Sequence, residues 1–566
     1  MIETVGTRGR KPWAFLEEYR GRFFNGQWPA LPEMFRISCS LYGDRPCLTI
    51  YEPDRISLTY TETLQKVEAI ARWLHGRGVK KGDKIGVTGK NSPEWAAAYL
   101  GVLFAGATVV PIDYQLKNEE LDLLLKTAKT IMLFVDEEKH AYYKGGACDL
   151  KEVISLKKGL GTYVYDLDGP EAVIEQAESG DLAAILFTSG TMGNPKGVML
   201  THENFVSDCY LAQGHMKLFC TDVFYALLPI HHAYTMLAVL IETLSVGAEV
   251  VFGKRMVTKA ILKDLKEAKI TMLLAVPLLF NKVLAGIIKG IREKGPIAYA
   301  LISFLMAISG FIKKVFKVNP GKKMFGFILE KASLTTLRIG ICGGGPLAPS
   351  VFKKYNQLGI DFVQGYGLTE TSPIINLNPV EAYKETSVGK VIPYVDMKIL
   401  DPDERGVGEV ILKGPMVMQG YFEMPEETAE IFTEDGYLKT GDLGYLDSEN
   451  YLYLTGRAKN MIVTEGGKNV YPEEIENEFQ LFEEIDQILV RGYTEGKGTA
   501  EHIEALVYPT PEWAEGKTEA DIEARANAIV SEVNQRLLPY QRIERTAIRK
   551  EPMEMTTTKK IKRDTV

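Results

Sequence analysis

The sequence predicts an α/β protein with a large N-terminal domain of helix-covered sheets, a β-rich subdomain within it, and a small α+β C-terminal domain. Three observations predict this class. Short apolar runs rich in β-branched residues alternate with helix-like segments through most of the chain. After about residue 380 the apolar runs become shorter and turn residues more frequent. A smaller unit with both helical and strand patterns follows from about residue 461.

The first part of the chain alternates strands with helices, which predicts largely parallel sheets covered by helices. Residues 61–77 and 94–104 have the 3.6-residue apolar spacing of helices. The predicted buried strands are 84–89, 108–113, 131–136, 183–188, 248–253, 272–277 and 337–343.

The second part divides into two units. Tight turns around 401–408, 435–436 and 447–450 predict a β-rich subdomain over about 380–458, so that the N-terminal domain spans 1–458. Residues 459–566 form the predicted C-terminal domain. Its expected helices are 473–480 and 519–537, and its expected strands are 488–493 and 502–508.

The composition is that of a globular protein, with 46% hydrophobic and 25% charged residues among 566. The net charge of −8 argues against nucleic acid as a partner. The six cysteines are scattered without a CxxC pair, which fits a reducing compartment. Residues 1–10 contain no apolar run of the secretory kind. We therefore expect a cytoplasmic protein.

A glycine-rich run at 185–198 carries the clearest chemical signal. An apolar strand leads into a loop with three glycines, three hydroxyls and a lysine. Glycines allow a ligand to approach the backbone closely, and consecutive N–H groups form an anion nest. A flexible polar hairpin is the alternative. The residues expected to hold phosphate are Thr188, Ser189, Gly190, Thr191, Gly193 and Lys196.

Two further motifs offer groups suited to a nucleotide. Tyr366 stands between two glycines, so that its ring can present an open face to a flat base, and Glu370 follows with a carboxylate suited to Mg²⁺. Asp442 is an acceptor for ribose hydroxyls, and Arg457 supplies a guanidinium. Taken singly, these residues could also be a satisfied turn tyrosine, a turn aspartate and a surface ion pair.

Two motifs lie in the C-terminal domain. Paired glycines at 466–467 precede a strand-like run and Pro472, which alone would indicate a glycine turn that begins a helix. A lysine-rich run at 556–563 would alone be interpreted as a frayed basic tail. Near the middle of the chain, His231 and His232 follow an apolar run, where the alternatives are a hydrogen-bonded core pair and a chance metal-binding pair. Zinc would need further ligands, and the sequence nearby offers no third one.

In this order, the motifs resemble those of the adenylate-forming superfamily, which contains acyl-CoA synthetases, peptide-synthetase adenylation domains and firefly luciferases. The resemblance implies that Tyr366 stacks on adenine, Thr369 contacts phosphate, and Thr191 and Glu370 bind Mg²⁺. It implies ribose contacts for Asp442 and Arg457. The other residues implied at the nucleotide are Gly343, Gly344, Gly345, Gln364, Gly365 and Gly367.

The same resemblance assigns the moving parts. Lys459 is the hinge of a mobile C-terminal domain, and Gly466, Gly467 and Lys468 line the tunnel for the pantetheine arm of coenzyme A. Lys560 is the catalytic lysine, whose ammonium stabilises charge on the α-phosphate. His232 flanks the acyl pocket.

The length and an insertion before Cys342 most resemble long-chain fatty acyl-CoA synthetases. The expected activity is therefore the ATP-dependent joining of a medium- or long-chain fatty acid to coenzyme A through acyl-AMP. Three alternatives stay open: an acyl-carrier protein as acceptor, a short-chain or aromatic acid as substrate, and a non-catalytic nucleotide- or acyl-binding protein. A homodimer also stays open.

The insertion contains an uncharged run at 295–312 with lysines on both sides. Basic residues beside an apolar helix suit an in-plane contact with anionic lipid, through about 295–323. A buried core segment or acyl-tunnel wall and a true membrane span are the two alternatives.

Overall fold

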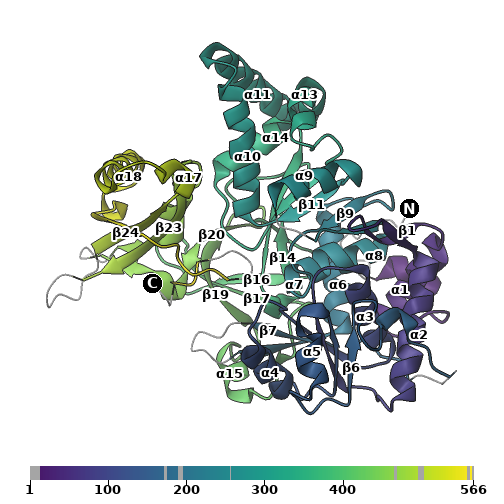
Figure 1. The fold of residues 1–566 in the computed structure, drawn as a ribbon. Helices are drawn as coiled ribbons and strands as arrows, with labels where there is room; N and C mark the ends of the chain where they lie inside the picture. The colour runs from purple at the N-terminus through teal and green to yellow at the C-terminus, as the bar shows by residue number, and fades with distance from the viewer. Residues whose placement is uncertain are drawn as a thin grey trace.

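The computed structural model describes residues 13–170, 175–188, 195–254, 257–464, 468–494, 502–556 and 561–563. Two large sheets with helices between and around them form the N-terminal part, and a smaller α+β unit lies beside them (Figure 1). The predicted α/β class with a small C-terminal unit is confirmed.

The larger sheet is a ladder of thirteen strands. Its strands run parallel from β1 to β13 and antiparallel from β13 to β16, so the change of pairing comes earlier than the predicted boundary at 380. In ladder order the strands are β2 (Ile56–Thr59), β1 (Pro46–Ile50), β10 (Glu249–Phe252), β9 (Val223–Ala226), β11 (Met272–Ala275), β12 (Ile339–Cys342), β13 (Asp361–Gly367), β14 (Ile374–Leu377), β15 (Gly389–Val391), β20 (Tyr451–Arg457), β19 (Leu438–Leu446), β17 (Gly408–Lys413) and β16 (Asp396–Leu400).

The second sheet has seven strands, most of them parallel. At one edge of this sheet, β8 pairs antiparallel with β7 on one side and with the edge strand β18 on the other. In order the strands are β18 (Gly420–Tyr421), β8 (Lys196–Thr201), β7 (Leu182–Thr188), β4 (Thr108–Ile112), β3 (Lys84–Thr88), β5 (Met132–Val135) and β6 (Glu152–Ser155).

Helices between the two sheets form the main core. Helix α3 (Pro93–Phe104) is buried at every residue except Glu94, as expected of a helix that is apolar on all sides and contacts both sheets. Helix α2 (Tyr60–Gly76) begins with a capping box between Thr59 and Glu62. The other helices of this part are α1 (Leu31–Tyr42), α4 (Asn118–Thr127), α5 (Glu137–Lys144), α6 (His202–Ala212), α7 (Ala233–Thr235), the π-helical η4 (Met236–Ile241), α8 (Glu242–Val246), α9 (Thr258–Glu267), α14 (Pro349–Gln357) and α15 (Pro425–Glu430).

Most cysteines lie in this core as free thiols. Cys39, Cys47, Cys209 and Cys342 are buried. Burial raises the pKa of Cys39 to about 12 and that of Cys47 and Cys209 well above the usual value.

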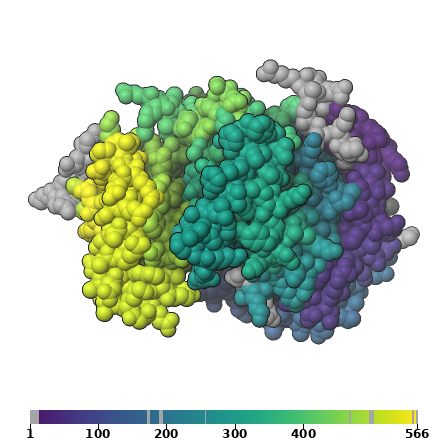
Figure 2. Space-filling model, turned by 90° about the horizontal axis from the view of Figure 1, so that it is seen from above, coloured from purple at the N-terminus to yellow at the C-terminus, as the bar shows by residue number. Residues whose placement is uncertain are grey.

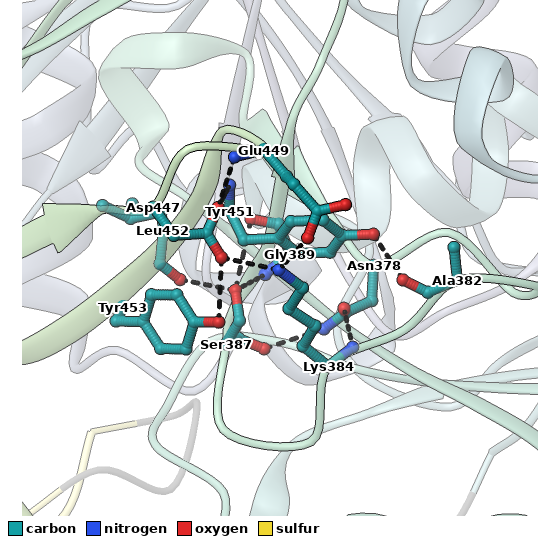
Figure 3. A network of polar contacts seen from close by, with 10 residues as sticks. All are labelled: Asn378, Ala382, Lys384, Ser387, Gly389, Asp447, Glu449, Tyr451, Leu452 and Tyr453. Carbon is teal, nitrogen blue, oxygen red and sulfur yellow. Dashed lines mark hydrogen bonds and ion pairs between the residues drawn. The ribbon is translucent and has the colours of Figure 1, made fainter. Parts of the chain in front are cut away.

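A network of hydrogen bonds and ion pairs connects residues 378–389, at the start of the β-rich subdomain, to the hairpin of β19 and β20 (Figure 3). Lys384 donates to Asp447 at 2.7 Å and also contacts Glu449. Ser387 donates to the carbonyl of Leu452 at 2.7 Å. Burial alone would raise the pKa of Asp447, but Lys384 and the backbone amides of Tyr451 and Glu449 outweigh it and lower the pKa to about 2. This network fixes the closed end of a hairpin whose open end carries Asp442 and Arg457.

The C-terminal unit has two small sheets of its own. The strands β21 (Ile462–Val463) and β22 (Asn469–Val470) form a hairpin, and β23 (Ile485–Tyr493), β24 (His502–Pro509) and β25 (Arg545–Ile548) form a three-stranded sheet. The helices α16 (Pro472–Asn477), α17 (Pro511–Ala514) and α18 (Glu519–Asn534) accompany them.

A helical lobe projects from the body beside this unit, toward the viewer in Figure 2. It consists of α10 (Pro277–Arg292), α11 (Pro296–Phe316), α12 (Gly321–Met324) and α13 (Gly326–Lys331). Within the described residues, α11 is the one helix long and apolar enough to cross a membrane, and only 17% of its apolar window is buried. The interpretation of 295–312 as a buried core segment is therefore wrong, because most of this helix faces outward.

One buried lysine fastens α11 to the body. The ammonium of Lys313 donates to Asn356 and to Asp361 at 2.7 Å each, and to the carbonyl of Ile360 at 3.3 Å. Burial lowers the pKa of Lys313, against the opposing effect of Asp361. A buried lysine is tolerated at this position because three acceptors replace the water molecules that its ammonium would bind in solution.

Replacement of Lys313 with methionine should lower the free energy of unfolding by about 2 kcal/mol, since Asn356 and Asp361 each lose their shortest hydrogen bond, the one from the ammonium. The neighbouring Lys314 is 61% exposed and pairs with Glu385, so Lys314→Met should cost about 0.5 kcal/mol or less. Urea unfolding followed by circular dichroism measures both. Equal losses for the two variants would contradict the anchoring role of Lys313.

Candidate active site

The glycine-rich run joins two paired strands at the edge of the second sheet. Thr188 at the end of β7 stands opposite Lys196 at the start of β8. The ammonium of Lys196 lies 4.8 Å from the ring centroid of Tyr421. The predicted phosphate contacts Ser189, Gly190, Thr191 and Gly193 lie outside the described residues. The structure thus places the two ends of the predicted loop, Thr188 and Lys196, side by side.

Tyr421 also links Lys196 to the predicted magnesium ligand. Its hydroxyl donates to the Glu370 carboxylate at 2.9 Å, and the Glu370 carbonyl accepts from the amide of Met418. Glu370 belongs to the short helix η5 (Thr369–Thr371), which follows β13 directly. Lys196, Tyr421 and Glu370 therefore converge from three separate segments, with one carboxylate oxygen already oriented by a hydrogen bond.

The predicted adenine and ribose residues form a second cluster. The hydroxyl of Tyr366 donates to Asp442 Oδ2 at 2.6 Å, and Arg457 Nε lies 2.7 Å from Asp442 Oδ1. Asp442 and Arg457 are opposite one another on β19 and β20. Burial, and then the charge of Asp442, raise the pKa of Tyr366 well above its usual value. A phenol, a carboxylate and a guanidinium thus meet where β13 reaches the β-rich subdomain.

Glycines bring the backbone close to this cluster. A side chain at Gly367 would overlap the carbonyl of Pro373, since an added Cβ would lie 1.5 Å from its oxygen. A side chain at Gly343 would meet the ring of Tyr234 at 2.9 Å. The remaining predicted glycines, Gly344, Gly345 and Gly365, and the buried Gln364 lie on the same two strand ends, after β12 and along β13.

A cavity lined chiefly by apolar side chains lies against these glycines. Its lining includes Gly343, Gly344 and Tyr366 on the nucleotide side. On the other side it is lined by Ala238, Leu274, Ile374 and Leu377, with Glu242 at one wall. An apolar ligand in this cavity would therefore end beside the groups that suit a nucleotide.

The histidine pair lies at the start of the helix that borders this cavity. His232 precedes α7, and its ring centroid is 4.2 Å from that of the buried His231. Burial, then the neighbouring His232, lower the pKa of His231 well below its usual value. Asp113, which follows β4, reaches within 3.8 Å of His231. Together with His232, Asp113 and His231 place ligand atoms within 4.8 Å of one another, so a third candidate metal ligand is present that the sequence did not indicate.

Two predicted residues of the C-terminal unit, Lys459 and Lys468, lie within the described part of the chain. Lys459 is in the short helix η6 (Ala458–Asn460) directly after β20. Lys468 donates its amide to Thr464 across the hairpin of β21 and β22, while Gly466 and Gly467 lie outside the described residues.

Lys560 also lies outside the described residues, but its flanks do not. Met555 bridges Ile561, and Arg563 makes two contacts of 2.6–2.7 Å with Glu476. A frayed tail is therefore the wrong interpretation for Ile561, Lys562 and Arg563.

Gln480 connects the C-terminal unit to the loop beside the cavity. Gln480 accepts from the amide of Ala348 at 2.8 Å and donates to the carbonyl of Pro346 at 3.1 Å. Asn281 of α10 donates to the same side chain at 3.3 Å. These contacts hold the unit directly beside Gly343–Gly345, and a motif search does not reveal them because Gln480 lies in no motif.

Comparison with known proteins identifies the family. The signature of the family described as AMP-binding enzyme matches residues 35–422, more than half of the chain. The chain belongs to this family. The predicted resemblance to this family is thereby confirmed.

Individual relatives include acid–thiol ligases. The long-chain-fatty-acid–CoA ligase heimdall of Drosophila melanogaster is 30% identical over 491 residues, which cover 79% of this chain and 72% of that protein. The chloroplastic long-chain-fatty-acid–[acyl-carrier-protein] ligase AEE15 of Arabidopsis thaliana is 27% identical over 576 residues, covering 87% and 78%. The anthranilate CoA ligase AuaEII, solved with anthranoyl-AMP, superposes with a TM-score of 0.78 at 19% identity and covers 95% of this chain and 96% of that one.

Besides Asp113 and Gln480, sequence reasoning missed two other groups of this AMP-binding enzyme, Tyr421 and Glu242. Tyr421 is on a two-residue strand outside every motif, and only its pairing with β8 brings it to Glu370. Glu242 directly follows the apolar π-helical segment Met236–Ile241. A single charged residue after an apolar segment is the one sequence feature that could have pointed to it. Both depend on contacts between segments far apart in the chain.

The Asp442 cluster yields a prediction for nucleotide binding. Asp442→Asn removes the charge that faces Arg457 and one strong acceptor, so we expect ATP binding to weaken about tenfold. Isothermal titration with a non-hydrolysable ATP analogue measures the change. Asp435→Asn, in an exposed turn of the same subdomain, is the matched control and should bind normally. Normal binding by Asp442→Asn would refute the ribose assignment.

Proposed function

We propose that the protein is an AMP-forming acyl-CoA synthetase that activates a medium- or long-chain fatty acid with ATP and transfers it to coenzyme A. One observation carries this proposal: the largely apolar cavity shares Gly343, Gly344 and Tyr366 with the cluster suited to a nucleotide. An acid whose chain fills the cavity would present its carboxylate to a bound ATP at that shared wall. The fatty-acid ligases among the relatives support the substrate class.

In the first half-reaction, the carboxylate oxygen attacks the α-phosphorus, and the bond to pyrophosphate breaks. Acyl-AMP forms and pyrophosphate leaves with the bonding electron pair. Lys196, whose ammonium lies over the ring of Tyr421, and Lys560, which resemblance assigns to the reacting oxygens, stabilise the charge that develops. Arg457 and Asp442 hold the ribose, so that the α-phosphate is positioned for attack.

Glu370 fits a magnesium site, because Tyr421 orients its carboxylate as an outer partner orients a metal ligand. Glu370 and Thr191 would hold Mg²⁺. The ion would supply neutralisation of the phosphate charge.

In the second half-reaction, the thiol of coenzyme A attacks the acyl carbon, AMP leaves and the thiol proton passes to solvent. The C-terminal unit would turn about Lys459 between the two steps, withdrawing Lys560 and bringing Gly466–Lys468 to the thiol. Such a rotation has to break the hydrogen bonds of Gln480 to Pro346 and Ala348. It also has to break the ion pairs of Lys282 with Asp486 at 3.6 Å and of Arg292 with Glu483 at 3.7 Å, which join partly exposed side chains that water can solvate after the movement.

A carrier-protein acceptor is the second candidate, favoured by the Arabidopsis relative that is named for that acceptor. Thioester formation compared between free coenzyme A and a holo acyl-carrier protein separates the two. The primary proposal requires faster transfer to coenzyme A.

Replacement of Lys560 with alanine is expected to lower acid-dependent exchange of pyrophosphate into ATP by at least a hundredfold, because the transition-state charge loses its ammonium. Thioester formation from supplied acyl-adenylate should survive. Lys562→Ala is the matched control, since Lys562 pairs with Glu554 and should keep normal exchange. Normal exchange in Lys560→Ala would overturn its assignment.

We also propose that this enzyme works at the cytoplasmic membrane surface through α11. The residues Ile297, Leu301, Phe304, Phe311 and Val315 are each more than half exposed. Their spacing of four, three, seven and four residues puts them on one stripe of the helix. Lys289 and Arg292 precede this helix in the chain and Lys317 follows it, an arrangement that suits an in-plane helix on anionic lipid.

The double variant Phe304→Glu and Phe311→Glu should weaken binding to phosphatidylserine-containing vesicles about tenfold or more, since two apolar side chains no longer insert. Vesicle sedimentation measures this. Leu123→Glu, an equally exposed leucine on α4, is the control and should leave sedimentation unchanged. If all variants sediment like the wild type, α11 is not the contact.

A further inference from the structure

The helix that borders the cavity presents three residues to it at equal spacing. Tyr234, Ala238 and Glu242 all line the cavity, four residues apart along the continuous stretch of α7, η4 and α8. The ring of Tyr234 lies against Gly343, on the nucleotide side. Glu242 therefore lies about two helical turns beyond Tyr234, on the side of the cavity away from the nucleotide. The small side chain of Ala238 leaves the space between them open.

Glu242 is a buried carboxyl without a hydrogen-bond partner on one of its oxygens. It is 1% exposed, and its Oε1 has no partner. Such a group loses its water without compensation, and native proteins keep few of them. Burial raises the pKa of Glu242 to about 8, so that it is mostly a neutral acid at pH 7. An unsatisfied carboxyl at a cavity wall indicates a ligand that supplies the missing partner.

The other polar side chains of the cavity wall already have partners. The hydroxyl of Tyr234 donates to the carbonyl of Ile341 at 3.2 Å, and that of Tyr366 donates to Asp442. Glu242 therefore stands as an open polar group among apolar walls formed by residues such as Leu274, Ile374 and Leu377. An unsubstituted fatty acid would bury it against methylene groups and leave it unsatisfied.

The groups around Glu242 also indicate which kind of hydrogen-bond donor a ligand would bring to it. The ionisable groups on which Glu242 acts are Asp208, Cys209 and Tyr234, each of them an acid. Asp208 accepts from the amide of Ile374 at 2.8 Å, behind the cavity wall. A neutral hydroxyl enters such an apolar cavity at far lower desolvation cost than an ammonium does. A hydroxyl can donate to one oxygen of Glu242 and can accept from the protonated carboxyl.

We propose that Glu242 recognises a hydroxyl group at the far end of the acid, so that the preferred substrate is an ω-hydroxy acid of medium chain length. This inference rests on the proposed function and names the substrate class of the same site. The carboxylate of the acid lies at the wall shared with the nucleotide, its methylene chain passes Ala238, and its terminal hydroxyl reaches Glu242. The discrimination arises because a matched acid without the hydroxyl leaves the buried carboxyl unpaired.

The test compares decanoic acid, its ω-hydroxy derivative and its ω-amino derivative as substrates of the full-length protein. AMP release with ATP, Mg²⁺ and coenzyme A gives kcat/KM for each. We expect the wild type to favour the hydroxy acid over decanoic acid by about ten- to a hundredfold. Glu242→Leu should abolish or reverse this ratio, mainly by improving the use of decanoic acid. Glu242→Gln keeps an acceptor and a donor, and its ratio should stay near that of the wild type.

Thr243→Val is the matched control, because it removes a buried polar group from the same helix without touching the cavity lining. Its ratio should equal that of the wild type. Thermal stabilisation by each acid without ATP provides a second readout that needs no turnover. If Glu242→Leu does not fold, the thermal stabilisation by each acid can still be compared between the wild type and Glu242→Gln.

Three results would overturn the assignment. The wild type could show no preference for the ω-hydroxy acid over decanoic acid, the preference could survive in Glu242→Leu, or the wild type could prefer the ω-amino acid to the ω-hydroxy acid. Failure of the proposed function has a different appearance. In that case no acid would support AMP release, while selective thermal stabilisation by the hydroxy acid would still report on Glu242.

Discussion

The hydrogen bond from Tyr366 to Asp442 joins the two halves of this architecture. Tyr366 lies on β13, the strand at which the thirteen-stranded ladder changes from parallel to antiparallel pairing, and Asp442 belongs to its antiparallel part. The bond therefore fixes the β-rich subdomain at the carboxyl ends of parallel strands, where ligand sites of α/β proteins commonly lie. Arg457 completes the junction from the next strand. The position of the apolar cavity follows, because its wall is made by the same strand ends.

The elements of the N-terminal domain could be predicted because their patterns are local. Buried parallel strands such as 84–89 and 272–277 are continuous apolar runs, and the structure has strands there at Lys84–Thr88 and Met272–Ala275. Helix α2 was predicted from its spacing and begins at its capping box. The short edge strand β18 was not predicted, since two residues give no periodicity.

The candidate site divides in the same way. Tyr366, Glu370, Asp442 and Arg457 could be proposed from motifs, because each chemical role needs a particular residue type at a particular turn. Tyr421 and Asp113 could not, since their contribution depends on which strand ends meet in space. Gln480 and Glu242 could not be assigned a role for a related reason. The role of such a polar side chain depends on the hydrogen-bond partners that it has or lacks in the folded protein, and these partners cannot be identified from the sequence.

The burial of most cysteines has a practical consequence for testing the proposed domain rotation. Burial raises the pKa of Cys39, Cys47, Cys209 and Cys342, so few of these thiols are deprotonated at neutral pH or reachable by a maleimide. Burial and the neighbouring Asp122 raise the pKa of the half-buried Cys148 to about 11 as well. Cysteines introduced on exposed positions on either side of Lys459 would therefore take up fluorophores ahead of these five native thiols. Single-molecule energy transfer could then follow the proposed hinge once the sixth cysteine, the partly exposed Cys220, is replaced.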